Sequence, residues 1–213
     1  MTVVCLDLEG VLAPEMWIAL ADSVEIEELR LTTRDVPDYD ALMRKRIQIL
    51  AEHDIRLPRI QEAIGAVHPL AGAARFLDRL RSHVQVVILS DTFSQFAGPL
   101  MEMLGRPTIF CNDLIVDAQG RIVDYRLRQE EGKRRAVEAF ASLNLHVVAG
   151  GDSYNDLAMI RAAHHGFLFS PPRRIRSENP TLPAFYEYDS VLKFVDTVVA
   201  SETETSASSD MAG

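Results

Sequence analysis

The sequence predicts an α/β protein with a doubly wound, mostly parallel, Rossmann-like sheet and an inserted small helical cap domain. Short runs rich in valine, isoleucine and leucine alternate with longer amphipathic stretches along most of the 213 residues. The runs are almost continuously apolar, which is typical of strands in a parallel sheet covered on both faces. Alternation of such strands with helices indicates a doubly wound fold.

The apolar runs are expected to be the strands, and the amphipathic stretches the helices that connect them. We predict strands at 2–8, 84–89, 108–111, 146–149 and 166–169. We predict helices at 71–82, 93–104, 133–143 and 155–164, where apolar residues recur with helical spacing. Within 114–128, two strand-like runs flank Asp117-Ala118-Gln119-Gly120, which predicts a β-hairpin.

Two segments interrupt this alternation. Residues 14–67 hold no convincing strand and are predicted to form three or four helices, with turn signals at Asp35-Val36-Pro37 and Leu57-Pro58. We expect 14–67 to be a cap domain inserted into an α/β core made of 1–13 and 68–200. Residues 201–213 are mostly small and polar without apolar periodicity, which predicts a disordered tail.

Composition excludes several classes of protein. With 22 basic and 31 acidic side chains the net charge is −9, which disfavours broad binding to nucleic acids or anionic membranes. Two cysteines are too few for a disulfide framework. The first residues do not resemble a signal peptide, and no apolar stretch approaches the ~20 residues that span a bilayer. We expect a cytoplasmic protein, and its charge does not forbid a small anionic substrate held in a local basic pocket. The oligomeric state, a homodimer included, stays open.

Polar side chains gather where predicted strands end. Ligands of open α/β sheets bind beyond the carboxyl ends of the strands. The residues expected there are Asp7 and Glu9 after the first strand, Ser90 and Asp91 after the second, Asp152, Asn155 and Asp156 after the fourth, and Lys133 at the start of a helix. The sequence therefore predicts an acid-rich edge that also carries a hydroxyl and an ammonium group.

These residue types suit phosphoryl transfer to a carboxylate. Asp7 would attack phosphorus and form an aspartyl-phosphate. A magnesium ion held by Asp7, Asp152 and the backbone carbonyl of Glu9 would offset the repulsion between phosphate and carboxylates. Lys133 and the Ser90 hydroxyl would stabilise charge on the phosphoryl oxygens. Glu9 would protonate the leaving alkoxide and then deprotonate the incoming water or alcohol.

Each motif alone also has a structural interpretation. Asp-x-Glu-Gly can be a turn, Ser90-Asp91-Thr92 a helix N-cap, and Lys133 a solvated surface lysine. The segment 151–156 is harder to explain in this way, because its carboxylates and amide at a strand-to-helix turn are typical of a metal site. The occurrence of all these motifs in order, each beside a strand end, favours catalysis.

The ordered set resembles the haloacid dehalogenase superfamily of aspartate-nucleophile phosphatases. Asp7-Leu8-Glu9-Gly10-Val11 resembles the first motif, Ser90 the second, Lys133 the third and Gly151-Asp152-Ser153-Tyr154-Asn155-Asp156 the fourth. A helical cap between the first motif and the second strand resembles the phosphoserine phosphatase branch. The resemblance implies a Mg²⁺-dependent phosphatase in which Ser90, Asp91, Lys133 and Asn155 contact the substrate and Asp156 supports the site.

One departure from the usual pattern narrows the resemblance. The first motif normally has aspartate two residues after the nucleophile, whereas this chain has Glu9. With Leu-Ser-Asp-Thr-Phe at 89–93, the chain resembles bifunctional phosphoserine phosphatases that also transfer the phosphoryl group to homoserine. The resemblance assigns the acid/base role to Glu9, whose carboxyl lies one methylene further out. A phosphatase for another small phosphate ester is the alternative, because fold does not fix substrate.

The predicted cap carries two candidate substrate ligands. On a helical wheel of 38–53, Arg46 projects from the middle of an apolar face formed by Tyr39, Leu42, Met43, Ile49 and Leu50. A guanidinium there needs an anionic partner, unless it forms an internal salt bridge or snorkels. Glu15, in a predicted first helical turn, can simply favour the helix dipole. The resemblance implies instead that Arg46 binds the substrate carboxylate and Glu15 its ammonium.

Two other classes fit less well. A phospho-acceptor receiver module also uses acids, a hydroxyl, a lysine and magnesium, but it is a single domain of ~120 residues without a helical insert. A catalytically inert binding protein on the same fold would not need every catalytic residue type that this chain contains. The predicted function is therefore a Mg²⁺-dependent phosphoserine phosphatase that works through an aspartyl-phosphate and can use homoserine as an acceptor.

Overall fold

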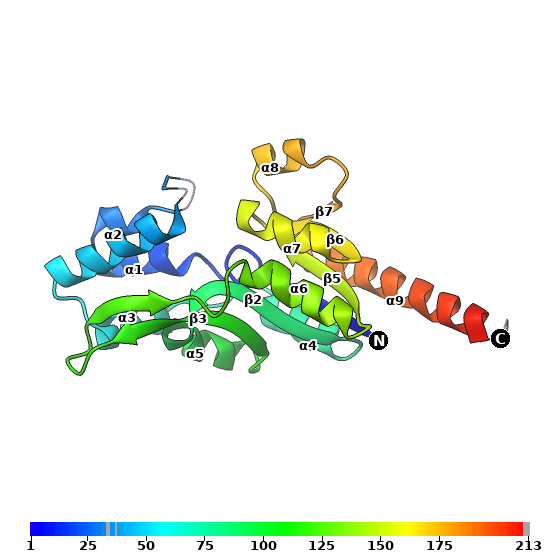
Figure 1. Cartoon of the computed structure of the whole chain (residues 1–213), viewed down its shortest axis with the longest axis horizontal. Helices are drawn as coiled ribbons and strands as arrows, with labels where there is room; N and C mark the ends of the chain where they lie inside the picture. The colour runs from blue at the N-terminus through cyan, green and yellow to red at the C-terminus, as the bar shows by residue number, and fades with distance from the viewer. Residues whose placement is uncertain (33–34, 37, 211–213) are drawn as a thin grey trace.

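A seven-stranded sheet forms the centre of the computed structural model, which describes residues 1–32, 35–36 and 38–210 (Figure 1). The strand order is β4-β3-β2-β1-β5-β6-β7, and neighbouring strands are parallel except for the antiparallel pair β3 and β4. The strands are β1 Thr2–Leu6, β2 Gln85–Phe93, β3 Thr108–Val116, β4 Ile122–Arg126, β5 His146–Gly151, β6 His165–Phe169 and β7 Ala184–Phe185. The doubly wound α/β fold is confirmed.

Both faces of the sheet are buried beneath helices. On β1, Val4 and Leu6 belong to one apolar cluster, while Val3 and Cys5 belong to a second one on the opposite face. The first cluster is covered by α4 Ala73–Arg81, α5 Ser94–Met103 and α9 Tyr188–Asp210, and the second by α6 Gly132–Ser142, α7 Leu157–Ala162 and α8 Arg173–Glu178. Because side chains of a strand alternate between faces, a strand covered on both sides must be apolar throughout.

Amphipathic spacing explains why these helices dock. In α4 the buried residues are Ala73, Phe76, Leu77 and Leu80, which share one stripe of the helix. Full burial of each large apolar side chain contributes about 1.5–3 kcal/mol. The remaining positions of α4 are mostly charged, so only one face of this helix can pack on the sheet.

Strand boundaries differ from the prediction near the carboxyl edge. β1 ends at Leu6, so Asp7 and Leu8 already lie beyond the strand, whereas β2 continues to Phe93. β3 runs on to Val116 and pairs with β4, which confirms the predicted hairpin. The Gly120 N–H donates to the Asp117 carbonyl (3.0 Å) in the connecting turn, and Gly120 adopts φ +81°, which favours glycine.

In the described part of 14–67 the regular elements are helical. They are α1 Met16–Val24, the short 3₁₀ helix η1 Glu27–Arg30, α2 Tyr39–Glu52 and α3 Leu57–Gly65. Leu57-Pro58 opens α3, where the missing N–H of proline has no cost. At the other turn signal, the N–H groups of Asp35 and Val36 both donate to the Thr32 carbonyl, while Pro37 lies outside the described residues.

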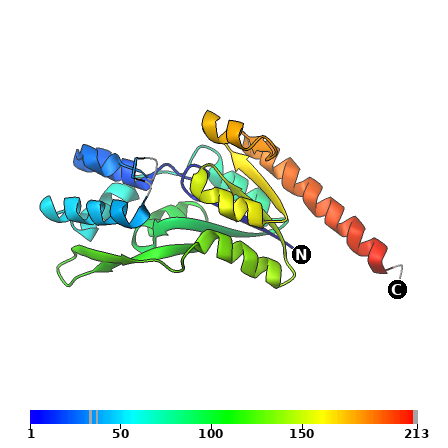
Figure 2. The same cartoon turned by 45° about the horizontal axis from the view of Figure 1, so that its top comes forward.

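The hairpin β3–β4 packs against the inserted helices, although the sequence analysis placed it in the core. It extends beneath α2 (Figures 1 and 2). The Leu57 N–H donates to the Gly120 carbonyl (2.8 Å), and the Tyr125 hydroxyl donates to Asp40 Oδ1 (2.7 Å). The Tyr39 and Tyr125 rings meet edge to face at 5.8 Å. The hairpin therefore ties the insert to the sheet.

The C-terminal helix departs from the prediction. α9 continues to Asp210 and projects beyond the sheet (Figure 2), so the expected disordered tail does not begin at residue 201; 211–213 lie outside the described residues. The polar residues after 200 include alanine and glutamate, which favour helix once a packed helix precedes them. Across the described ranges, no helix is both long and apolar enough to cross a membrane.

Candidate active site

The carboxyl ends of β1, β2 and β5 bring the predicted motifs together. Asp7 directly follows β1, and its N–H donates to the Gly150 carbonyl on the neighbouring strand β5 (3.0 Å). Ser90 and Asp91 lie where the register of β2 against β3 shifts. Such an irregularity turns side chains out of the regular pleat. Three strands that are distant in sequence therefore present polar groups at one edge.

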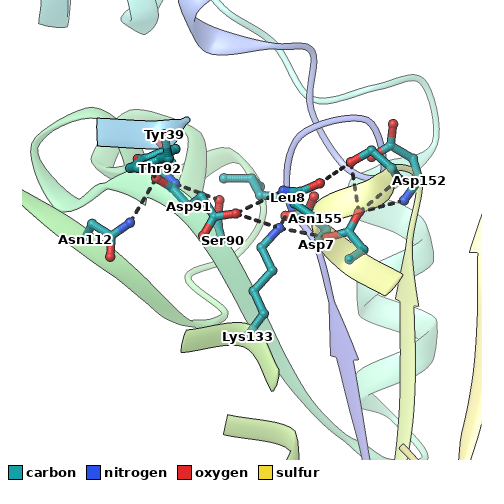
Figure 3. A network of polar contacts seen from close by, with 12 residues as sticks. Asp7, Leu8, Tyr39, Ser90, Asp91, Thr92, Asn112, Lys133, Asp152 and Asn155 are labelled. Carbon is teal, nitrogen blue, oxygen red and sulfur yellow. Dashed lines mark hydrogen bonds and ion pairs between the residues drawn. The ribbon is translucent and has the colours of Figure 1, made fainter. Parts of the chain in front are cut away.

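Lys133 lies at the centre of this edge (Figure 3). Its Nζ is 2.9 Å from Asp7 Oδ1, 2.8 Å from Asp156 Oδ1 and 3.3 Å from Asp91 Oδ2, and its side chain is only 6% exposed. Helix α6 begins at Gly132, so its first turn delivers the ammonium to the strand ends. The alternative of a solvated surface lysine is therefore wrong.

Charge in this cluster is strongly coupled. Burial opposes the positive charge of Lys133, but the three carboxylates hold its pKa well above the usual value. Burial and the nearby Asp156 raise the pKa of Asp7, while Lys133 counteracts them. Burial would also raise the pKa of Asp91, but Lys133 and a hydrogen bond from Asn155 bring it below the usual value. One ammonium therefore faces an excess of carboxylates.

Asp7 is placed as a nucleophile would be. It is 4% exposed, and its Oδ1 accepts from the Leu8 N–H (2.8 Å) and faces Lys133. The contacts that the described residues make to this carboxylate use Oδ1, which leaves Oδ2 for a ligand. A fixed carboxylate with one engaged oxygen can attack along a defined direction.

Asp156 organises the turn that follows β5. This fully buried side chain contacts Lys133 through Oδ1 and accepts through Oδ2 from the N–H groups of Asp152 (3.0 Å) and Ser153 (3.1 Å). With Ser153 it forms a capping box at the 3₁₀ helix η2 Tyr154–Asp156. Asp156 thus fixes both the lysine and the backbone that carries Asp152.

The residues present suit a divalent cation. One oxygen each of Asp7, Asp152 and Asp156 lie within 4.8 Å of one another. A Cβ on Gly10 would lie 2.4 Å from Asp152 Cγ, so the Glu9–Gly10 backbone runs directly against this carboxylate. Oxygen ligands of this kind, in negative excess, suit Mg²⁺. The predicted ligands were Asp7, Asp152 and the backbone of Glu9; the cluster adds Asp156.

The Glu9 side chain contacts the start of the inserted helices. Its Oε1 accepts from the Met16 N–H (2.7 Å), one of the unpaired donors at the start of α1. Burial, reinforced by the charge of Glu15, raises the pKa of Glu9 to about 7. Near neutral pH this carboxyl can therefore both donate and accept a proton.

Ser90 and Asn155 lie beside the same cluster. Ser90 is buried, and its Oγ accepts from the Thr92 N–H (3.2 Å). The Asn155 amide donates from Nδ2 to Asp91 Oδ2 (3.0 Å). These contacts bring the second and fourth motifs into direct contact with each other.

Two further side chains, which the sequence analysis did not assign to the site, hold Asp91 in place. The Tyr39 hydroxyl (3.2 Å) and Asn112 Nδ2 (3.1 Å) both donate to the Asp91 backbone carbonyl (Figure 3). Asn112 in turn accepts from the Arg128 N–H (3.0 Å). The only available signals were a polar residue within the apolar run 108–116 and a hydroxyl on the apolar face of 38–53.

Arg46 is buried in the insert at 6% exposure. Its Nη2 donates to the Leu31 carbonyl (2.7 Å), and the guanidinium stacks on the Trp17 ring, with Cζ 4.3 Å from the centroid. Among the described residues no carboxylate lies within ion-pair distance of Arg46, which excludes an internal salt bridge there. Burial lowers the pKa of Arg46 to about 10, an effect that Tyr39, Glu9 and Glu15 partly offset.

Glu15 is the N-cap residue of α1, one position before the expected first turn. Its side chain makes no capping hydrogen bond, and the Met16 N–H that follows it donates to Glu9 instead. Arg46 and Glu15 do not contact the Lys133 cluster directly. They lie on the insert, and their charges act on Glu9.

Comparison with known proteins identifies the family. The model of the haloacid dehalogenase-like hydrolases matches residues 16–161. The chain belongs to this family. It is 52% identical over 189 residues to a protein of Pseudomonas aeruginosa named phosphoserine phosphatase ThrH, with 89% of this chain and 92% of that protein covered. It is also 51% identical over 191 residues to a phosphoserine phosphatase of Pseudomonas syringae pv. tomato, covering 90% and 81%.

Solved structures of phosphoserine phosphatases share the fold. The apo form of a phosphoserine phosphatase superposes with a TM-score of 0.75 at 22% identity, covering 91% of this chain and 98% of the other. A phospho-aspartyl intermediate analogue of a phosphoserine phosphatase gives 0.73 at 22% identity, covering 91% and 98%. The predicted superfamily is confirmed.

Proposed function

We propose that this hydrolase is a Mg²⁺-dependent phosphoserine phosphatase that works through an aspartyl-phosphate on Asp7. The observation that carries the proposal is the buried Lys133, which is held by Asp7, Asp91 and Asp156 at the strand ends. Such a site can bind a phosphoryl group beside a fixed carboxylate. The names of the relatives at 51–52% identity support phosphoserine as the substrate.

In the first step, an Asp7 carboxylate oxygen forms a bond to phosphorus while the bond from phosphorus to the serine oxygen breaks. Lys133 and the Ser90 hydroxyl donate to the phosphoryl oxygens. Glu9 gives its proton to the departing serine oxygen, so that serine leaves as a neutral alcohol. A bound Mg²⁺, held by Asp7, Asp152 and the Glu9 carbonyl, would supply charge compensation for the dianionic phosphate.

In the second step, Glu9 takes a proton from the incoming water, and the water oxygen bonds to phosphorus. The bond to Asp7 breaks, which regenerates the carboxylate and releases inorganic phosphate. Glu9 is suited to both directions because its pKa of about 7 allows either protonation state at neutral pH. Asp156, Asn155 and Asp91 keep the motifs in position throughout.

Substrate selection is assigned to the insert. Arg46 is buried without a carboxylate partner among the described residues, so an anionic ligand would complete its environment. Glu15 presents a carboxylate that no capping contact uses. Together they would bind the carboxylate and ammonium of phosphoserine, and homoserine carries the same two groups. Homoserine can therefore enter after serine leaves and accept the phosphoryl group, with Glu9 as its base. Good positioning can outweigh the concentration of water.

The test has two arms. First, phosphoserine, phosphoethanolamine and a sugar phosphate are compared with Mg²⁺ and with a chelator. We expect strong preference for phosphoserine and loss of activity with the chelator; preference for the sugar phosphate would contradict the substrate. Second, phosphoserine is incubated with saturating homoserine and followed by phosphorus NMR. Phosphohomoserine is the expected product. Inorganic phosphate alone would mean that the enzyme hydrolyses phosphoserine but does not transfer the phosphoryl group to homoserine.

A further inference from the structure

Trp17 forms one wall of the site that holds Arg46. Trp17 lies in α1 and Arg46 in α2. The Arg46 guanidinium lies over the Trp17 ring, with Cζ 4.3 Å from the ring centroid. Trp17 is 8% exposed and Arg46 is 6% exposed, so water does not screen the contact. A cation over a desolvated indole face is attracted more strongly than at an exposed site.

The guanidinium is fixed on two sides but not satisfied. Trp17 covers one face, and the Leu31 carbonyl accepts from Nη2 (2.7 Å). Within the described ranges, Nη1 contacts only the weak acceptor Met43 Sδ (3.8 Å), and Nε is buried without a hydrogen-bond partner. A buried donor without an acceptor costs free energy, which a ligand carboxylate would recover.

We propose that Trp17 is a positioning residue that orients Arg46 for the carboxylate of an amino-acid phosphate. The inference rests on the proposed function, which it deepens by naming a determinant of substrate class. Trp17 is itself held from the sheet side, because its ring meets Phe96 of α5 edge to face at 5.5 Å. The orientation of Arg46 is thereby set by the packing between the insert and the core.

The kinetic test compares Trp17→Phe and Trp17→Leu on two matched substrates. Phosphoserine and phosphoethanolamine differ only in the carboxylate. With Trp17→Leu we expect KM for phosphoserine to rise about tenfold, kcat to change little, and phosphoethanolamine kinetics to change less than about twofold. Trp17→Phe retains a ring and should give an intermediate KM. Equal losses on both substrates, or no loss on phosphoserine, would overturn the inference.

A spectroscopic test does not depend on turnover. Trp17 is the single tryptophan of the chain, so its emission reports on the guanidinium that covers it. Replacing the cation in Arg46→Gln should shift the emission of the unliganded protein, whereas Lys45→Gln, on the exposed side of α2, should not. Identical spectra for native and Arg46→Gln proteins would overturn the contact. If the native enzyme turns over neither substrate, the proposed function fails. The emission comparison still tests whether the Arg46 guanidinium contacts Trp17.

Discussion

Lys133 is the one buried lysine among the described residues. A buried ammonium is stable only when its charge is compensated, and here three carboxylates provide that compensation. These carboxylates would in turn repel one another without the lysine. The residue therefore has a structural role in addition to the proposed contact with phosphate.

Replacing Lys133 by methionine should lower the free energy of unfolding by about 3–5 kcal/mol, because uncompensated buried carboxylates remain. Urea unfolding of the native and variant proteins measures this difference. Lys193→Met, at an exposed position on α9, is the matched control and should change stability by less than about 0.5 kcal/mol. A Lys133→Met protein as stable as the control would contradict the claim that Lys133 compensates the charge of the three carboxylates.

The proton on Glu9 should matter only when the leaving group needs it. Glu9→Gln keeps the shape of the side chain but removes the acid, so phosphoserine turnover should fall about 10²–10⁴-fold. For an ester with a good leaving group, such as p-nitrophenyl phosphate, the rate of the phosphorylation step should fall far less in Glu9→Gln. Burst kinetics with both substrates separate this step from hydrolysis. Equal losses in the burst rate would exclude Glu9 as the acid.

At the residue scale, the sequence predicted the groups that follow strand ends and missed those that arrive from elsewhere. Asp7 and Asp156 were found because local order along the chain determines which strand end delivers them, and Lys133 because it lies in the first turn of a predicted helix. Tyr39 and Asn112 lie 52 and 21 residues from Asp91, and the hydrogen bonds that join them depend on how the insert docks. No local spacing encodes that docking.

At the scale of elements, α2 contacts both the hairpin and β2, and so connects the proposed substrate ligands of the insert to the proposed phosphate site. α2 begins where Asp38 caps the Ala41 N–H (3.0 Å), which places Tyr39 over Asp91. The same helix carries Arg46 about two turns further along, on the same face as Tyr39. The sequence predicted the apolar face of this helix correctly, but not that its first residue, Tyr39, reaches β2.

Tyr39→Phe should lower kcat several-fold for phosphoserine and phosphoethanolamine alike, because the lost hydrogen bond positions Asp91 rather than the amino-acid moiety. Tyr125→Phe is the control: it removes a hydroxyl that bonds Asp40 at the exposed rim of the same contact, and it should change kcat less than twofold. Steady-state kinetics on both esters provide the readout. A loss confined to KM for phosphoserine would place Tyr39 in the substrate pocket instead.

At the scale of the whole molecule, a histidine cluster joins α9 to the opposite edge of the sheet. The His146 ring lies against the tilted rings of His164 (centroids 4.5 Å apart) and His165 (5.1 Å), and its Nδ1 lies 3.1 Å from Glu202 of α9. Burial lowers the pKa of His146, and the other imidazoles and the N-terminal amino group add to this, while Glu202 opposes it. The folded protein thus favours the neutral ring.

Because the folded-state pKa of His146 is lowered, its contribution to stability is complete above the ordinary value of about 6.5 and is lost as the pH falls below it. We expect the free energy of unfolding to decrease between pH ~7.5 and ~5.5. The decrease should be smaller in His146→Gln, whereas His68→Gln, at an exposed position, should keep the native profile. A native-like decrease in His146→Gln would show that other groups cause it.

The extent of α9 was the part of the overall architecture that the sequence predicted least well. Residues beyond 200 lack apolar periodicity, and a helix without an apolar face normally has little to hold it. Here the helix is already packed through Val191, Val195 and Val198, and it continues past that anchored part. Composition alone does not report such an extension.

The central claim is that the phosphoryl group passes through Asp7. The direct measurement is rapid acid quenching during phosphoserine turnover with Mg²⁺, followed by peptide mass spectrometry. We predict one acid-stable, base-labile phosphoryl group on the peptide that contains Asp7, formed at least as fast as turnover. Asp7→Asn should remain folded, carry no phosphoryl group and release no phosphate. A phosphoryl group on another residue, or substantial turnover by folded Asp7→Asn, would contradict the covalent mechanism.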